Sequence, residues 1–600
     1  MRVWQPGSHL TVQRGAEVSD WSWARTARRV STLARLTAPY RLRTALAVGS
    51  LVAATLTALA PPFLAKLAVD DGISEGDLGH LTLIVVLFVA AGLANLGTSA
   101  AQTYFTGWTG ERILADLRNK LFRHLQRLSL GYFERNRAGV IISRLTNDVE
   151  ALDQLVTDGV TSLFQNSLLL LGSAVILFFL DWRLALAALA VFPLMAIATS
   201  IFRVRSSRAY RAVRERLGLV TATLAEDIAG MRVVQSFTRE ERNQRQFRSV
   251  NTRYRESNQE TVVLNGLYFP FVDFLSAVAT ATVLGFGGWL ALNGEVTVGT
   301  LFAFLLYLSN FFDPVQQLSQ LYNTFLSAVA ALDKITEVMD EEPQVVDRPD
   351  AGPLPQIDGR VRFEDVVFGY GDGPEILHGI DLDVPAGTTV ALVGHTGAGK
   401  STIAKLLARF YDPREGRITI DGHDLRDVTQ ESLRRQLGIV PQEGFLFAGT
   451  VRDNIAFGRP DASDEDVAAA ARAVGAEEFV LELEDGYGTE VAERGSRLSL
   501  GQRQLVAFAR ALLADPRILV LDEATSSVDI GTERRIELAL RRLLADRTAF
   551  IIAHRLSTIR RADLIVVLEH GCIVEQGTHD ELVALDGRYR SLYGDWAAAA

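Results

Sequence analysis

Cysteine is almost absent from this 600-residue chain. Its single cysteine, Cys572, excludes an internal disulfide and any zinc site built from cysteines. The nine histidines are scattered, without the spacing of metal ligands. A formal net charge of −10 argues against general nucleic-acid binding. Residues 1–29 lack an apolar core, so we expect no secretory signal there, and membrane delivery would depend on internal apolar segments.

Long apolar runs fill the first half of the chain, whereas the second half has the composition of a soluble α/β domain. A membrane-spanning helix needs about 20 consecutive apolar residues. Six runs meet this condition, near residues 45–65, 81–104, 162–180, 184–202, 264–292 and 301–329. Because 600 residues are too many for one core, we expect several domains. The sequence predicts a cytoplasmic segment (1–30), an α-helical six-span transmembrane domain (31–340), a linker (341–360) and an α/β P-loop ATPase domain (361–600).

The distribution of Lys and Arg predicts the orientation of the spans. No basic residue occurs between Lys66 and Arg112, whereas residues 25–43, 112–144 and 203–255 are rich in Arg. Basic loops stay on the cytoplasmic side of a membrane. We therefore expect the N-terminus, the two long loops and everything after the sixth span to lie in the cytoplasm.

The two long loops have a helical charge pattern. Residues 107–128 contain no proline and no glycine after Gly110, and they extend the second span. Residues 203–262 extend the fourth span in a similar way. At 1.5 Å per residue, about 20 helical residues extend roughly 30 Å beyond the membrane. Such extensions are suited to transmitting force between a soluble motor and a membrane cavity.

Polar residues within the spans are candidates for the substrate pathway, because burying them in lipid is costly. The candidates are Asp273, Asn265 and Gln165. The alternative for Asp273 is pairing with a neighbouring helix or exposure to water. We expect Asp313 and Pro314 in the sixth span to mark a helix irregularity.

A glycine-rich segment lies between an apolar run at 389–393 and a helical pattern at 402–409. Strand, glycine loop and helix together are the context of a phosphate-binding P-loop, in which backbone N–H groups and the helix N-terminus bind phosphate. Lys400 would reach the outer phosphates and the Ser401 hydroxyl would hold Mg²⁺. The alternative is an ordinary glycine turn before a helix. The candidate ATP-binding residues are Gly394, His395, Thr396, Gly397, Ala398, Gly399, Lys400, Ser401 and Thr402.

Residues 517–523 form an apolar run that ends in two carboxylates. A parallel core strand would place these carboxylates at the carboxyl edge of the sheet, beside the P-loop. Asp522 is suited to the Mg²⁺ shell through water, and Glu523 to activating the attacking water. His554, after the apolar run 548–553, would approach the γ-phosphate, although a lone histidine after a strand is more often structural.

Residues 497–505 contain Leu498, Ser499, Leu500, Gly501 and Gln502, about twenty residues before Asp522. This stretch resembles the signature motif of ATP-binding-cassette (ABC) proteins. Together with the P-loop, Gln442, the Asp522–Glu523 pair, the 526–529 stretch and His554, it covers 361–600 in family order. The six spans resemble the membrane domain of ABC exporters, and residues 489–495 resemble an exporter-specific stretch that contacts the coupling loops.

The resemblance implies further roles. Tyr370 would stack on adenine, with a surface-strand aromatic as the alternative. Gln442 would sense the γ-phosphate and Mg²⁺. Ser499 and Gly501 would bind a nucleotide held by the opposite subunit, and Asp529 would cross the dimer interface. Residues 136–146 and 220–228 match the coupling helices of the two cytoplasmic loops.

The resemblance also implies the function: a half-transporter in the bacterial cytoplasmic membrane that hydrolyses ATP with Mg²⁺ to ADP and phosphate. Its working unit would be a dimer that exports a hydrophobic or amphipathic drug, lipid or peptide. Two alternatives are an importer with an exporter fold and an ATP-gated regulatory membrane protein with little turnover.

Two positions depart from the family pattern. Leu500 replaces the usual glycine at the third position of the signature, and Ala492 replaces a glycine in the exporter-specific stretch. In heterodimeric exporters one subunit keeps its catalytic face and has an imperfect signature. We therefore expect a heterodimer. The alternative is a homodimer that tolerates Leu500, because Ser499 and Gly501 remain.

Overall fold

The computed structural model describes residues 37–442, 444–492, 495, 497–522, 530–553 and 555–599, without the side chains of 319, 320, 322, 323, 326, 530, 532 and 595–599. These residues form two compact units. The first contains residues up to Gln126 and Ala138–Glu341, and the second contains Arg127–Arg137 and Glu342 onward. Each unit is described by itself.

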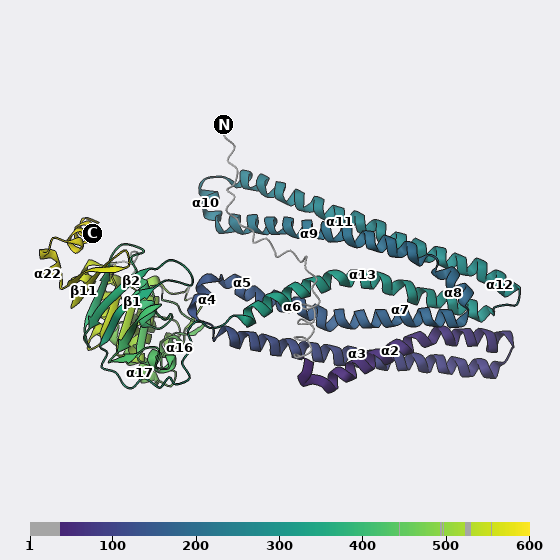
Figure 1. The fold of residues 1–600 in the computed structure, drawn as a ribbon, viewed down its shortest axis with the longest axis horizontal. Coiled ribbons are helices and arrows are strands. Elements are labelled where there is room, and N and C mark those ends of the chain that lie inside the picture. Colours follow the sequence, from purple (N-terminus) through teal and green to yellow (C-terminus); the bar gives the residue numbers. More distant parts are fainter. Residues whose placement is uncertain are drawn as a thin grey trace. The chain divides into compact units, whose positions relative to one another are not determined.

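The first unit is entirely helical (Figure 1). Among the described residues, six helical segments are long and apolar enough to cross a membrane, which confirms the predicted six-span class. The main helices are α2 (Arg41–Leu67), α3 (Leu78–Leu125), α7 (Val160–Leu180), α8 (Trp182–Leu189), α9 (Phe192–Ala229), α11 (Glu240–Thr282), α12 (Gly288–Leu292) and α13 (Val298–Asp340). Shorter helices are α5 (Ala138–Ser143), α6 (Val149–Asp153) and α10 (Met231–Ser236), with π-helical turns at Ala68–Ser74, Arg144–Asp148, Gln154–Gly159 and Val283–Gly287.

Side-chain caps fix where several of these helices begin. The Asp77 carboxylate accepts hydrogen bonds from the N–H groups of Gly79 and His80 at the start of α3. Asp181 does the same for Arg183 and Leu184, which turns the chain sharply between α7 and α8. A capped N-terminus satisfies backbone donors that the helix itself leaves unpaired. The tight hairpin expected between the third and fourth spans is therefore present.

The long extensions after the second and fourth spans are helical, as predicted. Their turns, however, do not lie at the predicted coupling segments. Helix α3 runs without a break to Leu125. Helices α9 and α11 pack along each other, and α10 joins them (Figure 1). The coupling segment expected at 220–228 belongs to the continuous helix α9, because the first break comes at Gly230. Helix α13 continues through Pro314, but this proline has no N–H to donate, and the Asn310 carbonyl oxygen accepts a hydrogen bond from the Ser173 hydroxyl at 3.4 Å.

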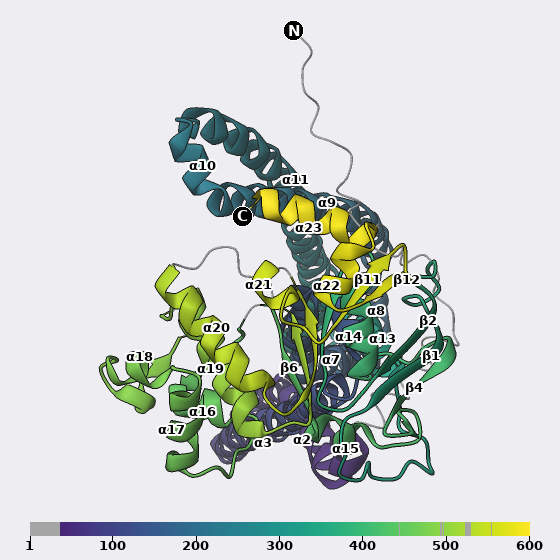
Figure 2. The same cartoon turned by 90° about the vertical axis from the view of Figure 1, so that its left-hand side faces the viewer.

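The second unit is an α/β domain with two main sheets (Figure 2). Within the described residues, a six-stranded sheet has the order β12 (Cys572–Gly577), β11 (Leu564–Glu569), β3 (Thr389–Val393), β10 (Thr548–Ile552), β9 (Ile518–Asp522) and β6 (Leu437–Val440). The neighbours from β11 to β6 pair in parallel, and β12 is antiparallel to β11. A second sheet has the order β2 (Leu377–Val384), β1 (Val361–Phe368), β4 (Glu415–Ile420) and β5 (His423–Asp424), and β7 (Gly449–Thr450) pairs with β8 (Glu490–Val491).

The helices of this unit are as follows: α4 (Leu130–Arg135), α14 (Lys400–Leu407), α15 (Gln430–Arg435), α16 (Val451–Ala456), α17 (Asp464–Ala473), α18 (Glu477–Leu481), α19 (Leu500–Ala514), α20 (Ile530–Leu544), α21 (Leu556–Ile559), α22 (His579–Ala584) and α23 (Arg588–Ala599). Helix α4 belongs here although it lies between two first-unit segments in the sequence. It ends before the coupling segment expected at 136–146.

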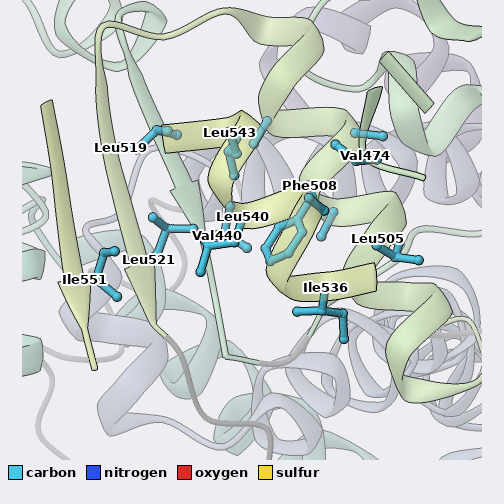
Figure 3. Close-up of a cluster of buried hydrophobic side chains, with 14 of the residues drawn as sticks. Val440, Val474, Leu505, Phe508, Leu519, Leu521, Ile536, Leu540, Leu543 and Ile551 are labelled. Atoms are coloured by element: carbon cyan, nitrogen blue, oxygen red, sulfur yellow. The ribbon is translucent and has the colours of Figure 1, made fainter. Parts of the chain in front are cut away.

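The four central strands of the six-stranded sheet, β11, β3, β10 and β9, are buried on both faces, as their near-continuous apolar sequences predict. Along β9, Leu519 and Leu521 pack into a cluster with helices α19 and α20, where Phe508 and Leu540 lie (Figure 3). The alternate residues of the same strand join a second cluster with the other sheet and α14. This packing holds the carboxyl ends of the central strands in fixed positions.

Candidate active site

The loop between β3 and α14 is built to place backbone close to a ligand. Gly394 has a φ of 149°, and a Cβ there would lie 2.3 Å from the carbonyl oxygen of Leu568. Gly399 has a φ of 105° and would place a Cβ 2.6 Å from Leu377. No other residue fits these backbone angles and contacts without strain. Helix α14 begins at Lys400, two residues before the start predicted from the sequence.

Lys400 is held inside this loop. Its ammonium donates hydrogen bonds to the carbonyl oxygens of Gly394 at 2.7 Å and His395 at 2.9 Å. The side chain is buried, and burial lowers the pKa of Lys400, while the nearby carboxylate of Asp522 raises it in part. The loop therefore presents a fixed positive charge at the N-terminus of α14, which suits a polyphosphate.

The sheet order brings the predicted acidic residue to the same edge. Strand β10 lies between β3 and β9, and Asp522 pairs in register with Ile552. Gln442 follows β6, the strand next to β9, and is exposed. The carboxyl ends of parallel strands meet at one edge. Gln442, Asp522 and the loop are therefore neighbours, whereas the predicted catalytic residues Glu523 and His554 lie outside the described residues.

Tyr370 lies just beyond β1, in an aromatic cluster. Its ring is edge-on to Phe368 and Tyr411, at centroid distances of 5.0 Å in both cases. Its hydroxyl is 3.2 Å from the Thr402 hydroxyl on α14. The sequence indicated Tyr370 and Thr402. It did not indicate Tyr411 or Lys405, whose ammonium is 5.3 Å from the centre of the Tyr370 ring.

The signature-like stretch forms the start of α19. Ser499 is the N-cap, and its hydroxyl accepts a hydrogen bond from the Gln502 N–H at 3.2 Å. The Gln502 side chain in turn accepts from the Ser499 N–H at 2.8 Å. Leu500 is the first helical residue and is partly exposed, so its side chain does not disturb the helix. Leu498 is buried beneath the cap, Gly501 follows within the helix, and Asp529 lies outside the described residues.

The donor set of this edge is compatible with a hard divalent cation. Magnesium prefers oxygen ligands and retains several waters. The Ser401 hydroxyl is exposed on the first turn of α14, and the Asp522 carboxylate and the Gln442 amide come from neighbouring strand ends. The residues present therefore fit a nucleotide-bound Mg²⁺.

Comparison with known families matches both units. The model of the ABC transporter transmembrane region matches residues 44–315. A second family model, described as ABC transporter, matches residues 377–526. This chain belongs to the ABC transporter family.

Relatives cover nearly the whole transporter. The uncharacterized ABC transporter ATP-binding protein YknV of Bacillus subtilis is 44% identical over 540 residues, which is 90% of this chain and 89% of the relative. An ATP-dependent lipid A-core flippase of Syntrophus aciditrophicus is 40% identical over 562 residues, 94% of this chain and 93% of the relative. A solved bacterial Atm1-family ABC exporter with ATP bound is similar with a TM-score of 0.77 and 33% identity, covering 93% of this chain and 98% of that one.

These matches confirm several predictions. The chain is an exporter-type ABC half-transporter and a multi-pass membrane protein, and its ATPase activity is coupled to transport. It binds ATP and works as a dimer.

The first unit of the transporter contains a cavity of about 740 Å³ between α7, α9, α11 and α13. Its lining combines aromatic and polar side chains, among them Phe202, Phe269, Arg203, Tyr210 and Asn265. Of the three polar candidates, only Asn265 lines this cavity, and its amide donates to the Tyr210 hydroxyl at 3.3 Å.

The other two polar candidates have partners elsewhere in the unit. Gln165 on α7 accepts a hydrogen bond from Gln102 on α3 at 3.1 Å. Asp273 on α11 accepts one from Gln316 on α13 at 2.9 Å. The structure thus does not bring the three candidates together. The sequence missed Arg203 and Tyr210, which periodicity alone could not have assigned to one face.

Proposed function

We propose that this protein exports a hydrophobic or amphipathic substrate, such as a lipid, drug or peptide, across the bacterial cytoplasmic membrane. The observation that carries the proposal is a large, partly polar cavity in the helical unit of a chain that also has a P-loop ATPase unit. The exporter similarity and the named flippase relative support the direction. The Arg-rich extensions support a cytoplasmic position for the ATPase unit and the N-terminus, because basic loops stay on the cytoplasmic side of a membrane.

The residues of the ATP site have distinct roles in this proposal. The N–H groups of the 394–402 loop and the Lys400 ammonium bind the phosphates, and Tyr370 stacks on adenine. Ser401, Gln442 and, through water, Asp522 would hold Mg²⁺, and the bound ion would neutralise phosphate charge. Glu523 takes a proton from the water that attacks the γ-phosphorus, while the bond between the γ-phosphorus and the β–γ bridging oxygen breaks and ADP leaves. His554 donates a hydrogen bond to the γ-phosphate.

The transport cycle follows from two such sites. ATP binding favours the closed arrangement of two ATPase units, because each nucleotide then contacts a P-loop and the opposite signature, including Ser499 and Gly501. The long helical extensions pass this closure to the cavity, which opens outward. Hydrolysis and phosphate release restore the first state.

We further propose that the dimer is a heterodimer. The chain retains Lys400, Asp522, Glu523 and His554, whereas its signature carries Leu500. A branched side chain at the start of α19 adds bulk where a nucleotide meets the opposite subunit. The site that uses this chain's P-loop and the partner's signature would then carry most turnover.

Reconstitution of the purified transporter in liposomes tests this function. We expect ATP-dependent movement of a fluorescent amphipathic substrate in inside-out vesicles and none with Glu523→Gln. Accumulation in the opposite direction would indicate an importer. Gating of an ion conductance by ATP without steady-state ATPase would indicate a regulatory protein instead.

A further inference from the structure

Helix α4 contributes one carboxylate to the ATPase unit, and both of its oxygens are used. Glu134 Oε1 is 2.8 Å from the Lys405 ammonium on α14. Glu134 Oε2 accepts a hydrogen bond from the Tyr411 hydroxyl, also at 2.8 Å. The Glu134 side chain is 37% exposed and that of Lys405 is 30% exposed, so water only partly screens the pair.

The two partners of Glu134, Lys405 and Tyr411, both contact the ring of Tyr370. Tyr411 meets that ring edge-on at 5.0 Å, with an angle of 81° between the planes. The Lys405 ammonium is 5.3 Å from the ring centre, within the range of a cation–π interaction. The hydroxyl of Tyr370 reaches Thr402 of α14 at 3.2 Å. The carboxylate therefore holds two of the side chains that fix the position of Tyr370.

The backbone of α4 packs closely against Tyr411. A Cβ on Gly131 would be 3.1 Å from the Tyr411 ring and 2.9 Å from the Gln344 side chain. The Ser129 hydroxyl, just before α4, accepts a hydrogen bond from the Val345 N–H at 2.9 Å. Any displacement of α4 must therefore shift Tyr411 or break these contacts.

Charge and burial reinforce the arrangement. Burial by itself lowers the pKa of Lys405, but the hydrogen bond to Glu134 and the further interactions with Tyr370 and Glu134 together outweigh this effect, and the pKa is raised. Burial, followed by the hydrogen bond to Glu134, raises the pKa of Tyr411. Glu134 thus favours the charged form of Lys405 and the protonated form of Tyr411 beside Tyr370.

We propose that Glu134 is a positioning residue for the nucleobase: through Lys405 and Tyr411 it fixes the ring of Tyr370 and so sets the affinity for the base of ATP. The proposal rests on the proposed stacking of Tyr370 on adenine. Because Glu134 lies on α4, the affinity for the base of ATP depends on the position of that helix. The triphosphate, held by the P-loop, does not depend on it.

The test compares ligands with and without a base. Mg-ATP and Mg-tripolyphosphate are titrated onto the full-length transporter in lipid nanodiscs. We expect Glu134→Gln, which keeps an acceptor for Tyr411 but removes the charge, to weaken ATP binding about three- to tenfold. Tripolyphosphate affinity should be unchanged. The apparent KM for ATP should rise by the same factor, with kcat nearly constant.

Two variants accompany this measurement. Lys405→Met should weaken ATP binding by a similar factor and leave the affinity for tripolyphosphate unchanged. It provides the test if Glu134→Gln does not fold. Glu431→Gln removes an exposed ion pair with Arg435 on the same unit and should change neither affinity. Equal loss for both ligands, or no loss for either in Glu134→Gln and Lys405→Met, overturns the proposal.

Tyr370→Ala tests the stacking of Tyr370 on adenine independently of the role of Glu134. Weaker ATP binding in Tyr370→Ala with normal binding in Glu134→Gln overturns the role of Glu134 alone. Normal ATP binding in Tyr370→Ala overturns the stacking itself, and the positioning role with it.

Discussion

The Lys400 ammonium donates a hydrogen bond, 2.7 Å long, to the carbonyl oxygen of Gly394 at the other end of the same loop. This contact holds the loop closed around a charge that is almost entirely removed from water. A buried ammonium is costly unless it has partners of opposite charge or dipole. The loop therefore carries a charge in place for the phosphates before ATP arrives.

Lys400→Ala should weaken ATP binding itself, because it removes the charge that compensates the outer phosphates. A charge-assisted hydrogen bond contributes about 1.5–3 kcal/mol, which is roughly a 10- to 150-fold change in Kd. Titration of Mg-ATP onto the purified transporter measures it. Lys120→Ala, which removes an exposed lysine of α3, is the matched control. Unchanged affinity in Lys400→Ala would contradict the phosphate-binding role.

The affinity for ATP should also depend on pH through Lys400. Burial lowers the pKa of this lysine, so its charged form is fully present at low pH and is lost as pH rises through that lowered value. As pH rises, the affinity for ATP should therefore begin to fall at a lower pH than it would if Lys400 had the pKa of an ordinary lysine. Kd values for ATP measured from neutral to alkaline pH test this. The part of the loss of affinity that is due to Lys400 should be absent in Lys400→Ala.

Glu523→Gln should leave ATP bound while slowing turnover. Loss of a positioned general base typically costs 10²- to 10⁴-fold in rate, or about 3–5 kcal/mol of barrier. Steady-state ATPase and ATP titration on the same preparation separate the two effects. Glu482→Gln, at an exposed position of the same unit, should match the unchanged protein in both. Near-normal hydrolysis in Glu523→Gln would rule out this residue as the base.

A contact in the helical unit yields a prediction about stability. Asp70 accepts hydrogen bonds from the Thr297 hydroxyl at 2.6 Å and the Gly299 N–H at 2.8 Å, which caps the start of α13. A Cβ on Gly299 would lie 2.5 Å from both the Asp70 carboxylate and the Lys66 carbonyl oxygen. Gly299→Ala should therefore destabilise the protein by about 1–3 kcal/mol and lower its Tm.

Thermal unfolding in detergent checks this prediction. Gly97→Ala is the control, because the added Cβ meets no atom within 4 Å and lies inside α3. That substitution should be neutral or slightly stabilising. A Tm for Gly299→Ala equal to that of Gly97→Ala would show that α13 can shift away from Asp70 at little cost.

Local patterns were sufficient to predict much of this transporter. Apolar length gave the six spans, and an apolar run ending in Asp522 gave a core strand with its carboxylate at the sheet edge. The turn after the fourth span was misplaced because it was taken from the resemblance, whereas the chain marks it with Gly230. Contacts such as Glu134 with Lys405 join residues far apart in the sequence. No periodicity reports which distant side chains meet, so these contacts required the fold.

The last prediction concerns the partner subunit. Leu500 begins α19, and the Ser499 cap is intact. We therefore expect the effect of Leu500 where the signature meets another subunit's nucleotide. We expect a heterodimer whose partner lacks a Glu at the position of Glu523. In that heterodimer Glu523→Gln should abolish cycling, whereas Leu500→Gly should change it little. Expression of this chain alone, with ATPase and oligomeric state measured, provides the decisive comparison. A stable homodimer with full activity and two equivalent sites would contradict the heterodimer, because it would show that the signature with Leu500 completes a working site.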